Sequence, residues 1–276
     1  MKSINAGRIV AFATLALFSL LMLTPFLWAV NTSFKSEADA SAAPVTILPE
    51  HGYTFEIYSY IFRLGEIPTW MINSLIVATG VTLITLVIST MAGYAFSRLD
   101  FTGRRFLLGV TVASIMIPGT IFIVPLFDEM LAFNMVDTFW GIILPQVVAP
   151  VMVFVLKRFF DGIPRELEDA ARVDGAGSVR IFVSIVLPLS RPIIAAVSIF
   201  TFVGAWNNFL WPYMVANDPD LMTLPVGLQT VTTGYGVVFA QNMAGAVMAA
   251  LPLIVVFLFF QRQIIRGIAT TGLGGQ

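Results

Sequence analysis

Two adjacent amide side chains, Asn207 and Asn208, lie in an otherwise apolar and aromatic stretch of the sequence. Amides exchange hydrogen bonds with hydroxyl groups, and aromatic faces pack on the CH face of a sugar ring. The stretch therefore predicts a surface for a polyhydroxylated solute. Two other interpretations stay open, because Trp and Tyr also anchor helices at bilayer interfaces and paired Asn can link helices. On a helix the amides would lie about 100° apart and need not face one path. The candidate solute-path residues are Trp206, Asn207, Asn208, Phe209 and Trp211.

The sequence offers no catalytic or metal-binding constellation. It contains one histidine, His51, and no cysteine, which excludes paired-histidine and thiolate metal sites. The phosphate-binding pattern G-x-x-x-x-G-K-[ST] is also absent from the sequence. The chain is therefore expected not to be an enzyme and to bind no metal or cofactor itself. A partner that drives it can do so only through different affinities for two conformations of this chain.

The composition indicates that the chain is surrounded by lipid. Hydrophobic residues make up 58% of the 276 residues and charged residues 11%, against about 45–50% and 25% in soluble domains. A soluble globule could not hide so much apolar surface. Ala40-Ser41-Ala42 resembles a signal-peptide cleavage site. However, the preceding apolar run exceeds the usual 7–15 residues or so and ends well before that site, which favours an uncleaved first span.

Six apolar stretches are long enough to cross a hydrocarbon core about 30 Å thick as helices of about 20 residues. The third and fourth contain prolines that predict kinked or locally broken helices, tolerated where neighbouring protein satisfies the freed backbone groups; these are Pro118, Pro125, Pro145 and Pro150. The sequence thus predicts an all-α membrane protein with six transmembrane helices at about 9–30, 72–95, 106–127, 138–156, 192–213 and 243–261.

The distribution of charge predicts the orientation of these spans. If the amino terminus is cytoplasmic, every Lys and Arg except Lys35 and Arg63 falls on the cytoplasmic side. The positive-inside rule therefore places both termini in the cytoplasm. The outer loops are acidic, and two interpretations stay open: a docking face for an external partner, or acidic residues that collect where positive ones are excluded.

The segment between the fourth and fifth spans, about 159–190, reads as two short helices joined by a tight turn. Pro164 suits a first helical position, and Gly175 can take the positive φ that ends a helix. Ser178 is the expected N-cap of the second helix, and Pro188 is expected to end or kink it. The small side chains of Ala170 and Ala171 would let another protein pack closely. A lid that folds back on the bundle is the alternative.

These residues resemble the EAA motif of permease subunits in ATP-binding-cassette (ABC) importers. The match consists of Asp169-Ala170-Ala171, Gly175, and then Ile185, Leu187 and Pro188. The resemblance extends from about the second span, whose Asn73-Ser74 entry is also typical, to the carboxyl end. It is strongest to the maltose-type carbohydrate-uptake permeases. Asp169 stands where the family usually has glutamate, so either Asp169 or Glu168 could make the charged contact with the ATPase.

The resemblance implies a type I ABC importer permease fold with three regions. Residues 1–71 would form the first helix and an extracytoplasmic loop, 72–262 the permease core, and 263–276 a cytoplasmic tail that is either frayed or in contact with the ATPase. The segment at 159–190 would be a coupling helix seated in an ATPase cleft. The residues implied in that contact are Glu168, Asp169, Ala170, Ala171, Asp174, Gly175 and Ala176.

The resemblance also implies the partners of the chain. They are a second permease subunit, two ATPase subunits that bind ATP and Mg²⁺, an extracytoplasmic solute-binding protein and membrane lipid, with no nucleic acid. The expected location is the cytoplasmic (inner) membrane of a bacterium or archaeon. The expected solute is a sugar or oligosaccharide, with glycerol-3-phosphate or a polyol as the alternative. An ion-coupled transporter is less favoured, because ionisable residues are not evident at mid-membrane, and a membrane-embedded enzyme lacks a catalytic constellation.

Overall fold

The computed structural model describes residues 6–234 and 238–272. Within these residues the chain is helical and contains no strand, which confirms the predicted all-α class. The chain divides into two compact units. One comprises Met1–Thr69 with Gly227–Pro252, and the other Trp70–Val226 with Leu253–Gln276. The candidate residues in the 159–190 segment and near Asn207 all belong to the second unit.

Three helices are long and apolar enough to span a membrane, namely α1 (Ala6–Ser33), α4 (Glu66–Arg98) and α15 (Phe239–Gly272). Three bent helix pairs could each form one further span, so the described residues hold up to six. The predicted tail at 263–276 continues α15 to Gly272, and residues 273–276 lie outside the described residues.

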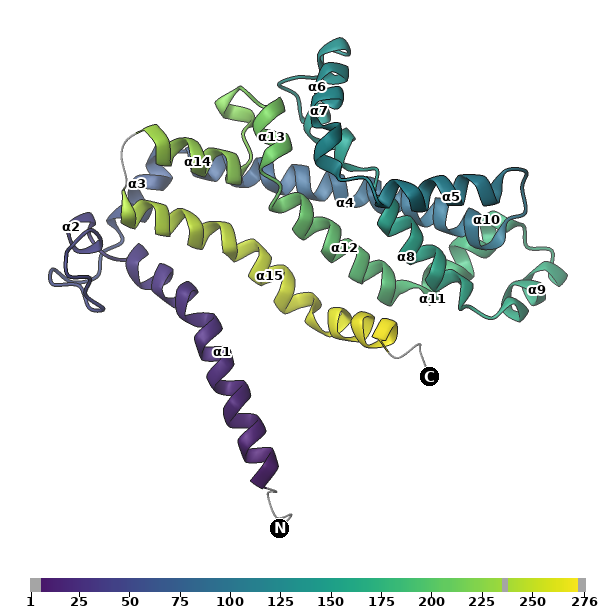
Figure 1. Cartoon of the computed structure of the whole chain (residues 1–276), viewed down its shortest axis with the longest axis horizontal. Coiled ribbons are helices and arrows are strands. Elements are labelled where there is room, and N and C mark those ends of the chain that lie inside the picture. Colours follow the sequence, from purple (N-terminus) through teal and green to yellow (C-terminus); the bar gives the residue numbers. More distant parts are fainter. Residues whose placement is uncertain (1–5, 235–237, 273–276) are drawn as a thin grey trace. The chain divides into compact units, whose positions relative to one another are not determined.

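The remaining elements are short helices that join or extend the spans (Figure 1). They are α2 (Glu37–Ala40), α3 (Glu56–Leu64), α5 (Arg104–Ile115), η1 (Gly119–Phe122), α6 (Ile123–Ala132), α7 (Phe139–Ile143), η2 (Leu144–Gln146), α8 (Pro150–Asp161), α9 (Arg165–Val173), α10 (Ser178–Ile181), η3 (Phe182–Val186), α11 (Leu187–Leu189), α12 (Arg191–Trp206), α13 (Leu210–Val215), η4 (Pro219–Leu221) and α14 (Leu224–Gly234).

The prolines explain where two of the spans bend. Pro118 stands immediately before η1, where α5 and the following helices bend by 96°. Pro150 is the first residue of α8, beyond a 48° bend. A proline fits the first turn of a helix because its missing N–H would have no partner there. The prediction of broken third and fourth helices is therefore confirmed.

The fifth span differs from the predicted continuous helix over 192–213. Helix α12 ends at Trp206, and α13 begins at Leu210. Two local features favour this break. The side-chain amide of Asn207 donates to the carbonyl of Val203 at 2.9 Å and so competes with the helical ladder. Pro212 then falls in the first turn of α13, where it displaces no backbone hydrogen bond.

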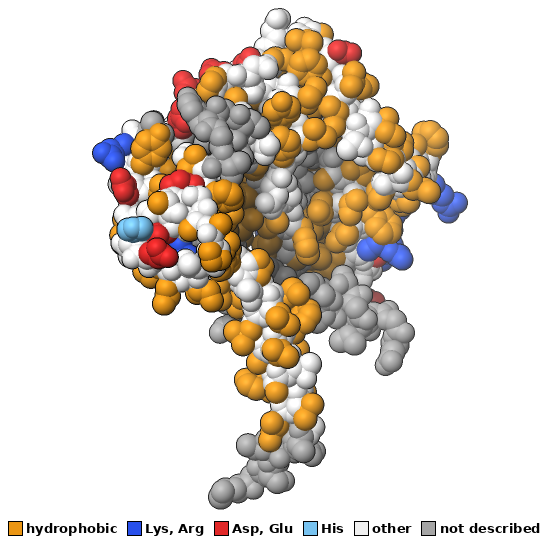
Figure 2. Space-filling model, turned by 60° about the vertical axis from the view of Figure 1, so that its left-hand side comes forward, with side chains coloured by type: hydrophobic (Ala, Val, Ile, Leu, Met, Phe, Trp, Pro, Cys, Tyr) orange, Lys and Arg blue, Asp and Glu red, His pale blue; other side chains and the backbone are white. Residues whose placement is uncertain are grey.

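Hydrophobic side chains remain widely exposed in the isolated chain. Large apolar residues along α1 are uncovered, among them Phe12, at 76% exposure, and Leu15. On the face seen in Figure 2, hydrophobic side chains spread over most of the described surface and charged side chains gather in few places. Lipid or a partner subunit must cover such a surface, since a soluble monomer rarely exposes large apolar patches.

The segment between α1 and α4 is held together by hydrogen bonds of charged side chains. The Lys35 side chain is buried, and its ammonium donates to the carbonyl of Thr46 at 2.6 Å. The carboxylate of Glu37 accepts hydrogen bonds from the backbone N–H groups of Phe239 at 2.7 Å and Ala240 at 3.0 Å, at the start of α15. A carboxylate is favourable there because the first N–H groups of a helix lack partners inside it.

The segment between α1 and α4 also contains a pH-dependent ion pair. The Nδ1 atom of His51 lies 2.9 Å from Oδ1 of Asp39, and the backbone N–H of His51 donates to Oδ2. The hydrogen bond to Asp39 raises the pKa of His51 above its ordinary 6.5, and the His51 side chain lowers the pKa of Asp39 below 3.8. The pair therefore stabilises the segment fully between these two ordinary values, where both groups carry charge.

We expect this stabilisation to be lost as the pH rises through the raised pKa of His51. A falling pH should remove it only below 3.8, as Asp39 titrates through its lowered pKa. Because His51 is the only histidine in the chain, its NMR titration reports this pKa directly. His51→Gln should abolish the decline in thermal stability that sets in above about pH 6.5. A titration midpoint at or below 6.5 would contradict the assignment.

Candidate functional site

A helical hairpin occupies the predicted coupling segment. Helix α9 ends at Val173, and Gly175 supplies the predicted left-handed residue that stops it, with a φ of +80°. The N–H of Gly175 donates to the carbonyl of Arg172 at 3.0 Å, and that of Ala176 donates to the carbonyl of Ala171 at 2.9 Å. These two bonds form a Schellman motif, which satisfies carbonyls at the end of α9 and fixes the direction in which the chain leaves it.

The predicted helix starts are each wrong by one residue. Pro164 has the extended ψ of 129° and precedes α9 instead of opening it. The proline ring of Pro164 fixes its φ angle but not its ψ angle. The helix therefore starts one residue later, at Arg165. Gly177, not Ser178, precedes α10, and no side chain caps that helix. The second helix continues through a π-helical turn over Phe182–Val186 into α11 and ends at Leu189, where the chain bends by 78° into α12, so the prediction that Pro188 ends or kinks this helix is confirmed.

The outer face of α9 presents small and apolar side chains beside exposed acidic groups. Ala170 is exposed, and Leu167 and Val173 expose 45% and 88% of their surface. The Asp169 carboxylate is 65% exposed, and its ion pair with Arg172, at 3.2 Å, lies on the surface. We name this face, Leu167, Asp169, Ala170 and Val173, the α9 face. Its shape allows close approach of another backbone, and its charge suits a cation.

A pocket of about 200 Å³ opens beside the α9 face. Asp174 and Arg180 supply opposite charges at its wall, while Ala171 and Ala176 keep that wall small. Both alanines also pack partly against the hydrophobic core beneath the hairpin. The remaining lining residues are Ile181, Ser184 and Ile185.

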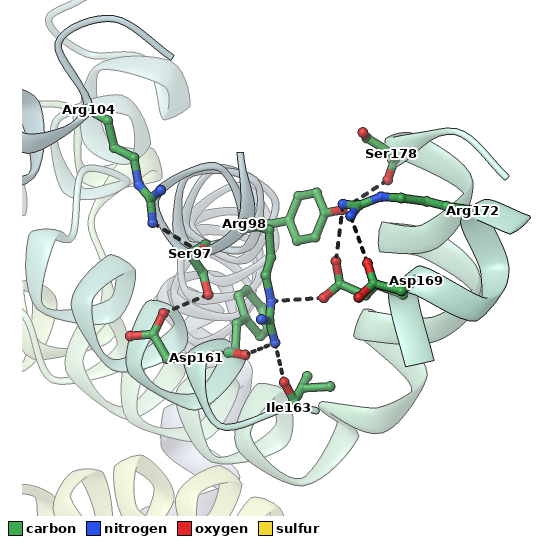
Figure 3. A network of polar contacts seen from close by, with 11 residues as sticks. Ser97, Arg98, Arg104, Asp161, Ile163, Asp169, Arg172 and Ser178 are labelled. Atoms are coloured by element: carbon green, nitrogen blue, oxygen red, sulfur yellow. Dashed lines mark hydrogen bonds and ion pairs between the residues drawn. The ribbon is translucent and has the colours of Figure 1, made fainter. Parts of the chain in front are cut away.

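Glu168 lies next to Asp169 in the sequence but faces the opposite way. Its side chain is 3% exposed, and Oε1 is 2.8 Å from Nε of Arg98, whose side chain is also 3% exposed (Figure 3). The two atoms form an ion pair without an aligned hydrogen bond. Arg98 also donates through Nη2 to the carbonyls of Phe160 and Ile163. The structure thus separates the two carboxylates that the motif left as alternatives.

A hydrophobic core supports the hairpin from below. It brings Tyr94 of α4 together with Leu156 and Phe160 of α8, Ile181 of α10 and Ile193 of α12. The backbones of α4 and α8 approach closely at Gly93. A Cβ on Gly93 would lie only 3.1 Å from the backbone nitrogen of Lys157. Burying several large apolar side chains contributes about 1.5–3 kcal/mol for each. The hairpin is therefore packed against the helices and is not a loose connection.

The candidate solute-path residues fall into two groups. Trp206 and Trp211 are buried, and Nε1 of Trp211 donates to the carbonyl of Gly141 at 3.2 Å. Asn207 and Phe209 are exposed, and Phe209 stacks on Tyr213 with ring centroids 5.2 Å apart. The two tryptophans therefore pack within the second unit, while the exposed members mark the break between α12 and α13.

Asn208 connects the break between α12 and α13 to a second helix break, the one before α8. Its amide donates to Oε1 of Gln146 at 2.7 Å, and Gln146 donates in turn to the carbonyl of Ile142 at 2.7 Å. Gln146 ends η2, just before the bend that precedes α8. Sequence reasoning missed Gln146, although an amide in a proline-containing apolar stretch is the same kind of signal as Asn207 and Asn208. Among the residues that the structure describes, no cluster of three metal-binding side chains occurs.

Comparisons with known proteins agree on one family. Residues 85–269 match the family model described as binding-protein-dependent transport system inner membrane component. The chain is 37% identical to the arabinooligosaccharides transport system permease protein AraQ of Halalkalibacterium halodurans, over 94% of each chain. It is 34% identical to the diacetylchitobiose uptake system permease protein NgcG of Streptomyces coelicolor, over 92% of this chain and 85% of the relative.

A solved structure has a similar fold. It is the crystal structure of a bacterial ABC transporter involved in the import of the acidic polysaccharide alginate. One of its chains matches with a TM-score of 0.84 and 20% identity, over 95% of this chain and 99% of that chain. At this identity the likeness supports the fold alone.

Proposed function

Because this chain belongs to the family of binding-protein-dependent transport system inner membrane components, we propose that it is one permease subunit of an ATP-driven importer for a sugar or oligosaccharide. Members of this family are permease subunits and not enzymes, and a separate subunit hydrolyses ATP. The observation that carries the proposal is the α9 face, an exposed surface on a hairpin that is packed firmly against the membrane helices. Such a surface can transmit movement from an ATPase to the bundle.

The proposed assembly contains a second permease subunit, two ATPase subunits that bind ATP and Mg²⁺, and an external solute-binding protein. Both termini and the hairpin lie in the cytoplasm, with the chain in the cytoplasmic membrane of a bacterium. Rocking of the two permease bundles would then open the path to each side in turn. Support for this orientation comes from the Lys and Arg residues of the sequence, of which all but Lys35 and Arg63 fall on one side.

Asp169, rather than Glu168, is proposed to meet a cation of the ATPase. The exposed Asp169 carboxylate can reach a partner without moving any buried group. Glu168 would first have to leave Arg98, and separating a buried ion pair costs about 3–5 kcal/mol. Ala170 would pack against the ATPase, with Ala171, Asp174, Gly175 and Ala176 shaping the adjacent pocket and turn.

The proposed solute class rests on the relatives and on the amides at the two helix breaks. The relatives reported above are named for transport of arabinooligosaccharides and diacetylchitobiose. Exposed Asn207 and the Asn208–Gln146 pair offer the donors and acceptors that sugar hydroxyls need. Phe209 adds an exposed aromatic face. A glycerol-3-phosphate or polyol solute remains the alternative within the same function.

Reconstitution of the complete complex in liposomes tests the proposal. We expect uptake of a labelled oligosaccharide that requires ATP, the binding protein and an ATPase with its phosphate-binding lysine intact. Transport by this chain alone, without ATP, would refute the importer function. In the same assay Asn207→Ala and Gln146→Ala should raise the KM for uptake while leaving the ATP hydrolysed per solute unchanged. Uptake of glycerol-3-phosphate but no sugar would contradict the solute class.

A further inference from the structure

The last turn of α4 presents three buried side chains on one side of the helix. Tyr94, Ser97 and Arg98 are spaced i, i+3 and i+4, so they lie on one face. Each contacts a different part of the segment around the hairpin. The Tyr94 hydroxyl donates to the carbonyl of Ser178 at 3.3 Å, and its ring packs on Phe182 at a centroid distance of 4.9 Å.

Ser97 ties α4 to the end of α8. Its hydroxyl donates to Oδ1 of Asp161 at 2.8 Å, and Lys157 donates to the other carboxylate oxygen at 2.6 Å. Arg104, in the next element, donates to the carbonyls of Phe96 at 3.0 Å and Ser97 at 3.1 Å. These bonds satisfy carbonyls at the end of α4 that have no partner within the helix, and they fix the helix terminus that carries Arg98.

Arg98 makes the central connection. Its planar guanidinium presents donors in a fixed fork, and here that fork joins one carbonyl in the last turn of α8 and one just beyond α8 to the Glu168 carboxylate of α9 (Figure 3). The position is also electrostatically favourable, because a cation at the carboxyl end of α4 complements the helix dipole. Replacing a buried ion pair by apolar residues is often neutral for stability. Stability alone therefore does not explain why two charges are buried here.

We infer that Arg98 is a positioning residue that makes α9, the end of α8 and the last turn of α4 move as one body. A displacement of the α9 face then moves α4, which is one of the long membrane helices, instead of bending the hairpin. The inference rests on the proposed function and deepens it, because it names the residue that passes movement from the hairpin into the membrane. The ion pair between Arg98 and Glu168 also explains why Asp169, and not Glu168, is the carboxylate that can reach the partner.

Spin labels test whether α9 and α4 move as one body while Arg98 and Glu168 are unchanged. The chain has no cysteine, so Met91→Cys on α4 and Arg165→Cys on α9, at positions exposed in the isolated chain, place two labels on this subunit of the complete complex. We expect one narrow distance distribution that stays the same in the nucleotide-free and ATP-bound states. A distance that changes between these states would overturn the inference, whatever the variants below show.

Coupling measurements test Arg98 and Glu168 themselves. Glu168→Gln and the apolar double variant R98M/E168M should lower the solute imported per ATP about tenfold, within the 5–150-fold range usual for coupled sites. The label distribution should broaden as well. Arg98→Lys, which keeps the positive charge, should recover part of the coupling. Full coupling in a folded double variant would overturn the inference. If the unmodified complex shows no ATP-driven uptake, the proposed function fails instead.

Discussion

Gly175→Val is expected to lower ATP-driven uptake about tenfold or more while the chain still inserts into the membrane. The Gly175 backbone has a φ of +80°, a region that costs a residue with a side chain roughly 1–2 kcal/mol, and more when that side chain is β-branched. A free-energy change of about 1.4 kcal/mol corresponds to a tenfold change in an equilibrium. Loss of the Schellman turn would rotate α10 relative to α9 and deform the pocket between them.

Controls separate this backbone effect from a steric one. No atom lies within 4 Å of a Cβ built on Gly175, so the larger side chain itself would have room. Gly175→Asn should therefore retain most of the uptake, because Asn tolerates positive φ. Gly177→Val introduces the same side chain two positions away, at a φ of −75° and also with open space, and should transport normally. Uptake in Gly175→Val equal to that of the unmodified complex would contradict the account of the turn.

Gly141→Ala is expected to be the most destabilising small substitution in the second unit. A Cβ at this position would overlap the backbone carbonyl oxygen of Met135. The backbone cannot move aside easily, because Asn134 and Asp137 already have positive φ and Thr138 caps α7 through the N–H of Gly141 at 3.0 Å. Overpacking typically costs about 1–3 kcal/mol, and here backbone must also shift.

Thermal unfolding in detergent measures this effect. The shift should also disturb the carbonyl of Gly141 that accepts from Trp211, so the fluorescence of the buried indoles should change with it. Gly109→Ala is the matched control, since that glycine lies inside α5 with nothing near a Cβ. It should be neutral or slightly stabilising, because Ala favours a helix over Gly by about 0.8–1.0 kcal/mol. Equal unfolding temperatures for Gly141→Ala and the unmodified chain would contradict the close approach.

Local sequence signals predicted the helical class and the end of α9. Apolar length identified the long spans, proline position predicted the breaks at Pro118 and Pro150, and Gly175 marked the left-handed turn. Each of these signals acts through the nearest few residues, so it can be recognised without knowledge of the fold. The one-residue errors at Pro164 and Ser178 reflect how little a single type constrains a helix start.

Long-range pairing could not be predicted in the same way. Arg98 and Glu168 are far apart in the sequence, and their common burial depends on how α4 and α8 pack. The same holds for Asn208 and Gln146, which meet only because two helix breaks face each other. Burial also distinguishes Glu168 from Asp169, which the sequence left equivalent. These features follow from tertiary contacts that no periodicity encodes.

Site-directed cross-linking from the α9 face tests the central claim most directly. A thiol-linked photoreactive probe on Ala170→Cys would be the only labelled position of this chain, which has no cysteine of its own. In the assembled complex we predict a covalent product with the ATPase subunit, weakened by the charge reversal Asp169→Lys. A probe that links only to this chain or to lipid in an actively transporting complex would contradict the account, as would labelling of the same cysteine from outside intact cells.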